Sequence, residues 1–129
     1  MKRIKIFISS VQSEFAQERE MLCQYIRTDA LLGKFFEPFI FEDVPANEYP
    51  ANHVYLREVE LCDIYLGLFG NLYGYEDIEG VSPTEREYDL AATLHKSRLI
   101  YIKAINENER HPKETALIRK VEQDIVRKT

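Results

Sequence analysis

The sequence predicts an α/β protein built on a parallel sheet, because short apolar stretches alternate with longer segments of helical periodicity. Consecutive parallel strands need right-handed crossovers, which place helices on both faces of the sheet. We therefore expect a three-layer sandwich with strand order 2-1-3-4. At 129 residues, 45% hydrophobic and 12% aromatic, the chain is long enough for one compact domain with its own core, which we place at residues 3–103 of a domain spanning 1–129.

The overall charge and the chain start exclude several classes of partner. The formal net charge of −5 argues against a broad surface for nucleic acid, which requires clustered lysine and arginine. No apolar run approaches the roughly 18 residues that would span a bilayer. Met1, Lys2 and Arg3 lead directly into a strand pattern without a signal-peptide core. We expect a cytoplasmic domain that contacts neither membrane nor nucleic acid directly.

In residues 3–9, polar and apolar residues first alternate and then give way to a continuous apolar run, which indicates a strand buried on both faces. A helix ending near Asp29 follows. The second apolar run, residues 35–41, contains Pro38 and is therefore expected at a sheet edge. A helix from about Asn52 then leads to residues 64–69, the best candidate for a central third strand.

A long loop at residues 70–81 precedes a helix from Ser82 to about Lys96. Residues 98–103 favour a fourth strand, and a last helix begins near Pro112. Because this helix reaches Thr129 without a cap, we expect the chain to continue into downstream domains.

The helix at Ser82 carries the signature of a capping box. Ser82 is a good N-cap, Pro83 suits the first helical position, and Glu85 stands three residues after the cap. We expect the Glu85 side chain to accept from the backbone N–H of Ser82. Glu87 has no such role, and helical spacing places it above Ala91 on an apolar face of the helix. Burial of a carboxylate on such a face is costly, which suggests that Glu87 is there for a function.

Glu87 is consequently the candidate catalytic residue. It could act at a ribosyl carbon as a nucleophile or as electrostatic support during cleavage of an N-glycosidic bond. The alternative is a surface ion pair with Arg57, Arg86 or a lysine.

In open parallel sheets, ligands bind beyond the carboxyl ends of the strands where strand order reverses. Here that point lies between the first and third strands, where Ser9, Ser10, the loop 70–81 and the start of the Glu87 helix should converge. Free N–H groups at a helix start attract phosphate, and Tyr73 or Tyr75 could stack on a base. The alternative is that Ser10 or Ser13 caps the first helix and the tyrosines only cover the loop.

Other chemistries have little support. Cys23 and Cys62 lack metal-ligand spacing and are expected to be free buried thiols. His53, His95 and His111 lie far apart without ligand-spaced partners, so no metal is expected.

Several segments together resemble an uncharacterised bacterial domain family related to TIR domains. The resemblance covers roughly residues 3–103 and is carried by residues 5–10 (KIFISS), 62–70 (CDIYLGLFG), 73–74 (YG) and 82–88 (SPTEREY). It implies a flavodoxin-like sheet, which TIR domains share with nucleoside deoxyribosyltransferases. Active members of both groups use a glutamate at a ribosyl carbon. The deoxyribosyltransferase motif Thr-x-x-Glu, with Ala four residues later, is matched by Thr84, Glu87 and Ala91, whereas Pro83 and Val81 depart from it.

The resemblance leaves two functions open. The first is a recognition, signalling or nucleotide-sensing module of a larger bacterial ATPase or helicase-related regulator of the Schlafen type, with downstream domains or a second copy as partners. The second is an NAD or nucleoside glycohydrolase, or a deoxyribosyltransferase-like enzyme. In either case we expect NAD or a nucleotide as ligand. The candidate ligand-binding residues are Ser9, Ser10, Gly70, Tyr73, Ser82 and Thr84, with Glu87 as the catalytic residue.

Overall fold

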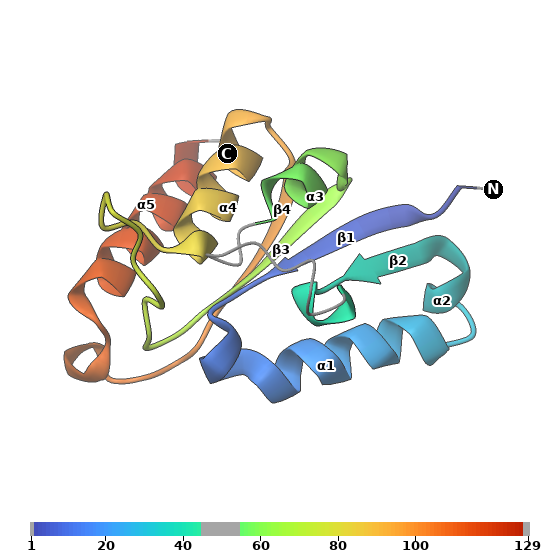
Figure 1. The fold of residues 1–129 in the computed structure, drawn as a ribbon, viewed down its shortest axis with the longest axis horizontal. Coiled ribbons are helices and arrows are strands. Elements are labelled where there is room, and N and C mark those ends of the chain that lie inside the picture. Colours follow the sequence, from blue (N-terminus) through green and yellow to red (C-terminus); the bar gives the residue numbers. More distant parts are fainter. Residues whose placement is uncertain (1, 45–54, 128–129) are drawn as a thin grey trace.

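The computed structural model describes residues 2–44 and 55–127 and contains a four-stranded parallel sheet of order β2-β1-β3-β4 (Figure 1). The strands are β1 (Ile4–Ser9), β2 (Phe36–Phe39), β3 (Ile64–Phe69) and β4 (Ser97–Ile102). The helices are α1 (Gln12–Thr28), α2 (Leu32–Phe35), α3 (Leu56–Leu61), α4 (Pro83–Thr93) and α5 (Pro112–Arg127), with short 3-10 helices at Phe41–Asp43 and Glu107–Glu109. The predicted α/β class, strand order and flavodoxin-like arrangement are confirmed.

Strand positions follow from the apolar patterns. β1 and β3 are the two inner strands, and β2, which contains Pro38, lies at an edge as predicted. The second strand is shorter than the predicted 35–41, because Phe35 ends α2 and Phe41 begins a 3-10 helix.

The core has two layers, one on each face of the sheet, because successive side chains of a strand point to opposite faces. In Figure 1, α1 lies on one side of the sheet and α3, α4 and α5 lie on the other. Ile6, Ile8 and Leu66 pack in a cluster that includes Cys23 and Ile26 of α1. On the opposite face, the second cluster comprises Phe7, Val59, Cys62, Tyr65, Phe69, Tyr73, Tyr88, Ala91, Leu117, Ile118 and Val121.

Gly67 of β3 makes room for aromatic packing. A Cβ at this position would lie 2.9 Å from the ring of Tyr65 and 3.0 Å from that of Phe69. Both side chains belong to the same strand face as Gly67, so a side chain at this position would collide with the neighbouring rings.

The first and fourth helices differ in detail from the sequence prediction. α1 has Val11 at its N-cap position without any side-chain cap, so the alternative that Ser10 or Ser13 caps it is wrong. The start of α3 near Asn52 falls outside the described residues. α4 ends at Thr93, short of Lys96, because His95 adopts a φ of 56°. The Lys96 ammonium instead donates to the carbonyls of Glu60 and Cys62 at the end of α3.

Only half of the predicted capping box forms at the start of α4. The Glu85 N–H donates to the Ser82 hydroxyl at 3.1 Å, as expected. The reciprocal bond is absent, because the Ser82 N–H donates to the hydroxyl of Tyr73 at 3.2 Å and that hydroxyl donates to the Glu85 carboxylate. The hydroxyl of Tyr73 thus bridges the Ser82 N–H and the Glu85 carboxylate, in place of the direct bond of a capping box.

The prediction for the two cysteines is confirmed within the described residues. Cys23 and Cys62 are buried free thiols. No helix in the described ranges is long and apolar enough to span a membrane. The cytoplasmic location stays a prediction.

Candidate functional site

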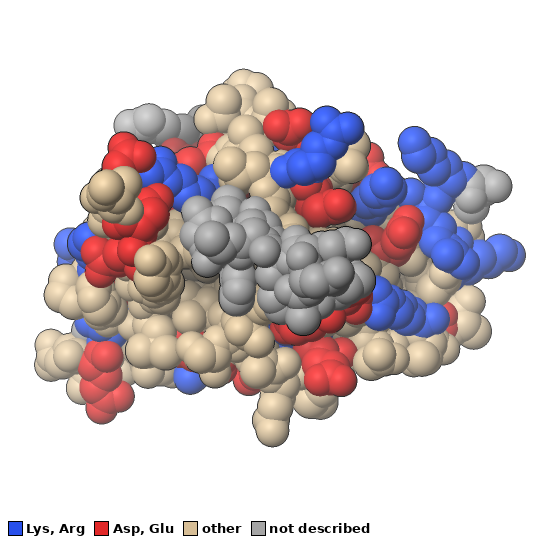
Figure 2. Space-filling view, viewed as in Figure 1, with Lys and Arg blue, Asp and Glu red and all other residues tan. Residues whose placement is uncertain are grey.

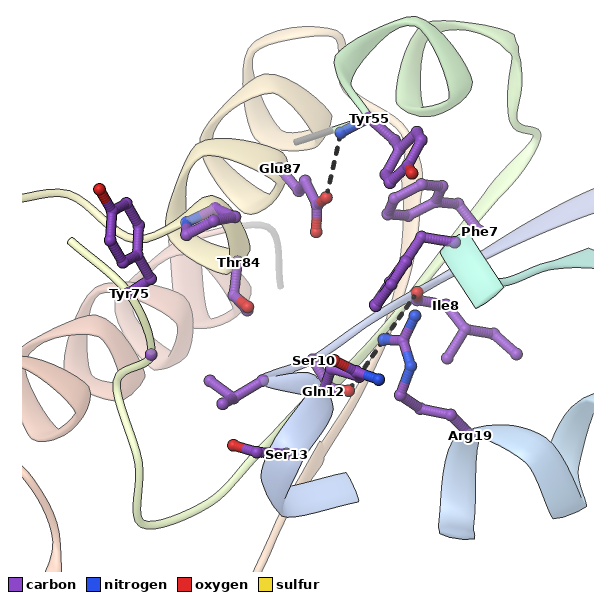
Figure 3. Close-up of a pocket in the computed structure, with 14 residues that line it drawn as sticks. Phe7, Ile8, Ser10, Gln12, Ser13, Arg19, Tyr55, Tyr75, Thr84 and Glu87 are labelled. Carbon is purple, nitrogen blue, oxygen red and sulfur yellow. Dashed lines mark hydrogen bonds between the residues drawn. The ribbon is translucent and has the colours of Figure 1, made fainter. Parts of the chain in front are cut away.

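A cavity of about 320 Å³ lies at the carboxyl end of β1, at the position predicted for a ligand crevice (Figure 3). Ser10 reaches it from the turn after β1, Tyr75 from the loop that follows β3, and Thr84 and Glu87 from the start of α4. The three predicted segments therefore do converge. Aromatic and apolar walls are added by Phe7, Ile8, Val11, Phe41 and Tyr55.

Glu87 is only 6% exposed and lies on the wall of this cavity. The Ser9 hydroxyl donates to its Oε1 at 2.8 Å, and the backbone N–H of Tyr55 donates to its Oε2 at 3.4 Å. Burial raises the pKa of Glu87 to about 7, although these two hydrogen bonds and the charge of Arg19 act to lower it. Near neutral pH, Glu87 therefore exists in both protonation states.

The alternative surface ion pair for Glu87 is wrong. Arg86 pairs with Asp77 at 3.0 Å and with Glu79 at 2.8 Å, and Arg57 lies 3.8 Å from Glu60. The side chain of Glu87 instead faces the pocket from the inner side of α4 (Figure 3).

Arg19 is a pocket residue that the sequence analysis missed. It is 2% exposed, and its guanidinium makes a bidentate pair with Glu42, with both N–O distances 2.9 Å. One of its nitrogens also donates to the Ser10 hydroxyl at 3.0 Å and to the Ile8 carbonyl at 3.4 Å. A signal was present in the sequence, because Arg19 continues the buried i, i+4 stripe of α1.

Four predicted ligand residues do not line the cavity. One of them, Ser9, lies behind it and donates to Glu87, and the other three have structural roles. Tyr73 and Ser82 are buried in the hydrogen-bonded start of α4. The Gly70 N–H donates to Oε2 of Glu114 at 3.2 Å. Neither Gly70, Tyr73 nor Ser82 lines the pocket, and Tyr75 is the loop tyrosine that does.

Two glutamates from distant helices anchor the loop after β3. Glu14 accepts from the N–H groups of Asn71 and Leu72 at 2.8 to 3.0 Å. Glu114 is 1% exposed, and its Oε1 has no hydrogen-bond partner among the described residues. Burial raises the pKa of Glu114 to about 7, and the nearby Glu14 charge acts in the same direction. These residues support the pocket wall without lining the cavity.

Metal ligands are not grouped in the part of the chain that the structure describes. No cluster of three histidine, cysteine, aspartate or glutamate side chains there could hold an ion. His53 lies outside the described residues, so the prediction made for it is untested.

Charged side chains of both signs are intermixed on the face shown in Figure 2, and lysines and arginines are most frequent at the end where β1 begins. The expected lack of nucleic-acid contact stays a prediction.

One family matches nearly the whole chain. The sequence model of the family described as domain of unknown function DUF4062 matches residues 5–129. The chain belongs to this family. No curated protein and no solved structure matches the chain significantly. Membership of an uncharacterised domain family is thus confirmed, and the relationship to TIR domains stays a prediction.

The DUF4062 pocket combines groups suited to a polar ligand with an apolar part. The carboxylate of Glu87 can accept hydrogen bonds from hydroxyls, and aromatic rings can pack against a planar group. Glu87 is the one carboxylate among the described residues that line this cavity.

Proposed function

We propose that this DUF4062 domain binds a ribose-containing ligand, a nucleoside, nucleotide or NAD, with the ribose beside Glu87. The observation that carries the proposal is the buried carboxylate of Glu87, held on the wall of a cavity by Ser9. In this proposal the domain is a TIR-like recognition, signalling or nucleotide-sensing module of a larger bacterial ATPase or helicase-related regulator.

The chemistry of ribose suits this carboxylate. A buried carboxylate needs hydrogen-bond donors, and among the described residues Glu87 receives one bond from Ser9 and one longer bond from Tyr55. Two neighbouring ribose hydroxyls would supply further donors in bidentate geometry. The rings of Phe7 and Tyr75 offer apolar surface for the base, and about 320 Å³ is at the small end of ligand cavities.

Cleavage of an N-glycosidic bond is the second candidate function, and it is favoured by the Thr84-x-x-Glu87 pattern, which brings both side chains to the cavity wall. In this reaction the ionised Glu87 attacks the ribosyl carbon, the carbon–nitrogen bond breaks, and its electron pair leaves with the base. Water then hydrolyses the resulting ester, which returns the carboxylate, releases a proton and frees the sugar: ribose from a nucleoside or ADP-ribose from NAD. If an ester does not form, the same carboxylate supports the developing positive charge while water attacks.

One experiment separates the two functions. The protein is titrated with adenosine, guanosine, cytidine and NAD by calorimetry, and product formation is followed by chromatography. Glu87→Gln is compared with the parent and with Glu20→Gln, a matched change at an exposed position of α1. Binding that is weakened by Glu87→Gln alone supports the proposal. Turnover lost with Glu87→Gln supports the enzyme, whereas equal turnover in both proteins rules out catalysis by Glu87. No binding of any of these ligands contradicts the proposed function.

A further inference from the structure

The first turn of α1 begins at the cavity without a cap. Gln12 and Ser13 line the pocket, and no side chain caps the helix at Val11. The backbone N–H groups of Gln12 and Ser13 have no hydrogen-bond partner among the described residues. α1 spans 17 residues but is kinked at Phe15, where φ is −115° and ψ is 24°. The positive potential at its start therefore comes from the free N–H groups of its first turn rather than from an unbroken helix.

Thr84 provides a second, independent observation on the same cavity. It is 4% exposed, and its hydroxyl makes no hydrogen bond with any described residue. Figure 3 shows that hydroxyl directed from α4 into the pocket, toward the start of α1. By contrast, the hydroxyls of Ser9, Ser10 and Ser82 are all engaged within the protein. The Thr84 hydroxyl is therefore free to bond with a ligand in the cavity.

The start of α4 offers few free donors to an anion. Its N–H groups at Ser82 and Glu85 are bonded to Tyr73 and to the Ser82 hydroxyl, and Pro83 has no N–H, so the N–H of Thr84 is the one left without a partner among the described residues there. Arg19 lies behind Ser10 on the α1 side of the cavity, where its charge is paired with Glu42. An anionic group entering the pocket therefore meets its donors at α1 and Thr84.

We propose that the first turn of α1 and the hydroxyl of Thr84 form a phosphate subsite, so that the preferred ligand is a nucleoside 5′-monophosphate. This inference rests on the proposed function for its ribose part. With the 2′- and 3′-hydroxyls toward Glu87, the 5′ end of the ribose points away from that carboxylate and can reach α1. The phosphate then accepts from the N–H groups of Gln12 and Ser13 and from Thr84.

The test uses two variants that preserve the fold. Thr84→Val removes the hydroxyl while keeping the shape, with Thr93→Val at an exposed position of α4 as its control. Gln12→Glu places a carboxylate at the subsite, where it suits the helix dipole but repels phosphate. The probes are inorganic phosphate, adenosine and adenosine 5′-monophosphate, measured by calorimetry and by amide chemical shifts.

Inorganic phosphate is expected to shift the amides of Gln12 and Ser13. The monophosphate is expected to bind about tenfold or more tightly than adenosine, because hydrogen bonds to charged groups are among the stronger ones. Thr84→Val and Gln12→Glu should each weaken monophosphate binding more than adenosine binding and so reduce that preference, whereas Thr93→Val should leave it as in the parent.

The outcomes separate this inference from the function on which it rests. If adenosine binds but the monophosphate gains nothing and neither variant matters, the phosphate subsite is overturned and the proposed function stands. If phosphate shifts both amides but neither adenosine nor the monophosphate binds, the subsite is supported and the proposed function fails. If none of the three probes has any effect, both are overturned.

Discussion

The hydroxyl of Ser9 donates a 2.8 Å hydrogen bond to Oε1 of Glu87, a residue 78 positions away in the chain. The bond joins the last residue of β1 to the second turn of α4, and both residues are nearly inaccessible to solvent. A lone carboxylate in such surroundings is held near neutral pKa by burial, and Ser9 is the partner that most favours its charged form.

Ser9→Ala should therefore raise the pKa of Glu87 further above 7. The change removes the hydrogen-bond donor to Oε1, which stabilises the charged carboxylate, whereas the burial that raises the pKa stays. We expect a loss of about 2 kcal/mol in the free energy of unfolding at pH 8, where the charged form matters most. Carboxyl-carbon NMR of Glu87 measures the pKa, and urea unfolding measures the stability. Ser13→Ala, which removes an exposed hydroxyl, is the matched control and should change neither. An unaltered Glu87 pKa in Ser9→Ala would show that Ser9 does not tune it.

Stability should fall as pH rises from about 4.5 to 7. Burial raises the pKa of both Glu87 and Glu114 from 4.5 to about 7, so in this window the folded state holds protons that the unfolded chain has released. Each group should contribute a decrease on the order of 1–3 kcal/mol across the window, with no further change above it. Thermal unfolding at successive pH values measures this slope.

Glu87→Gln and Glu114→Gln should each flatten part of that pH dependence, since an amide does not titrate. The exposed Glu20→Gln should leave the slope as it is in the parent. If stability still falls with pH in the double variant Glu87→Gln with Glu114→Gln, other titrating groups are responsible for the pH dependence.

The repeating features of the chain were predictable from sequence, and contacts between distant segments were not. Apolar stretches located β3 at Ile64–Phe69, and chain-crossover rules placed it beside β1. Glu87 was identified because helical spacing alone put it on the inner face of α4. Its partner Ser9 comes from another element, and only the folded chain reveals that bond.

Errors in the candidate site have the same origin. Tyr73 was assigned to ligand stacking because it stands in a loop near the crevice, whereas its hydroxyl takes over one bond of the capping box. Arg19 was overlooked although it continues the buried stripe of α1, because an arginine is usually exposed and its partners Glu42 and Ser10 come from other segments. Sequence rules describe neighbours along the chain, and these contacts join different segments.

Tyr73→Phe should destabilise the domain without affecting ligand binding. The change removes the hydroxyl that accepts from the Ser82 N–H and donates to Glu85, leaving a buried N–H unsatisfied. We expect a loss of about 1–3 kcal/mol in urea unfolding and unchanged affinity for a bound nucleoside. Tyr75→Phe, at an exposed tyrosine of the pocket mouth, should leave stability within about 0.5 kcal/mol of the parent. If Tyr73→Phe had normal stability but weakened ligand binding, Tyr73 would be a ligand-binding residue and this structural role would be wrong.

Arg19→Lys should destabilise the pocket side of α1 even though the charge is kept. An ammonium cannot reproduce the bidentate pair with Glu42 while also donating to Ser10. We expect a loss of about 2 kcal/mol in urea unfolding, because the pair is largely buried. Arg57→Lys is the control, since Arg57 is exposed and lies 3.8 Å from Glu60. Equal stability of the two variants would mean that the buried geometry of Arg19 contributes nothing.

The position of a bound ribose tests the proposed function most directly. Crystals of the domain would be grown with saturating adenosine 5′-monophosphate, and the electron density in the cavity at the end of β1 would be examined. We predict the ribose hydroxyls within hydrogen-bonding distance of Glu87 and the base against Phe7 or Tyr75. A nucleotide bound elsewhere, or an empty cavity at saturating ligand, would contradict the assignment of this pocket as a ribose site.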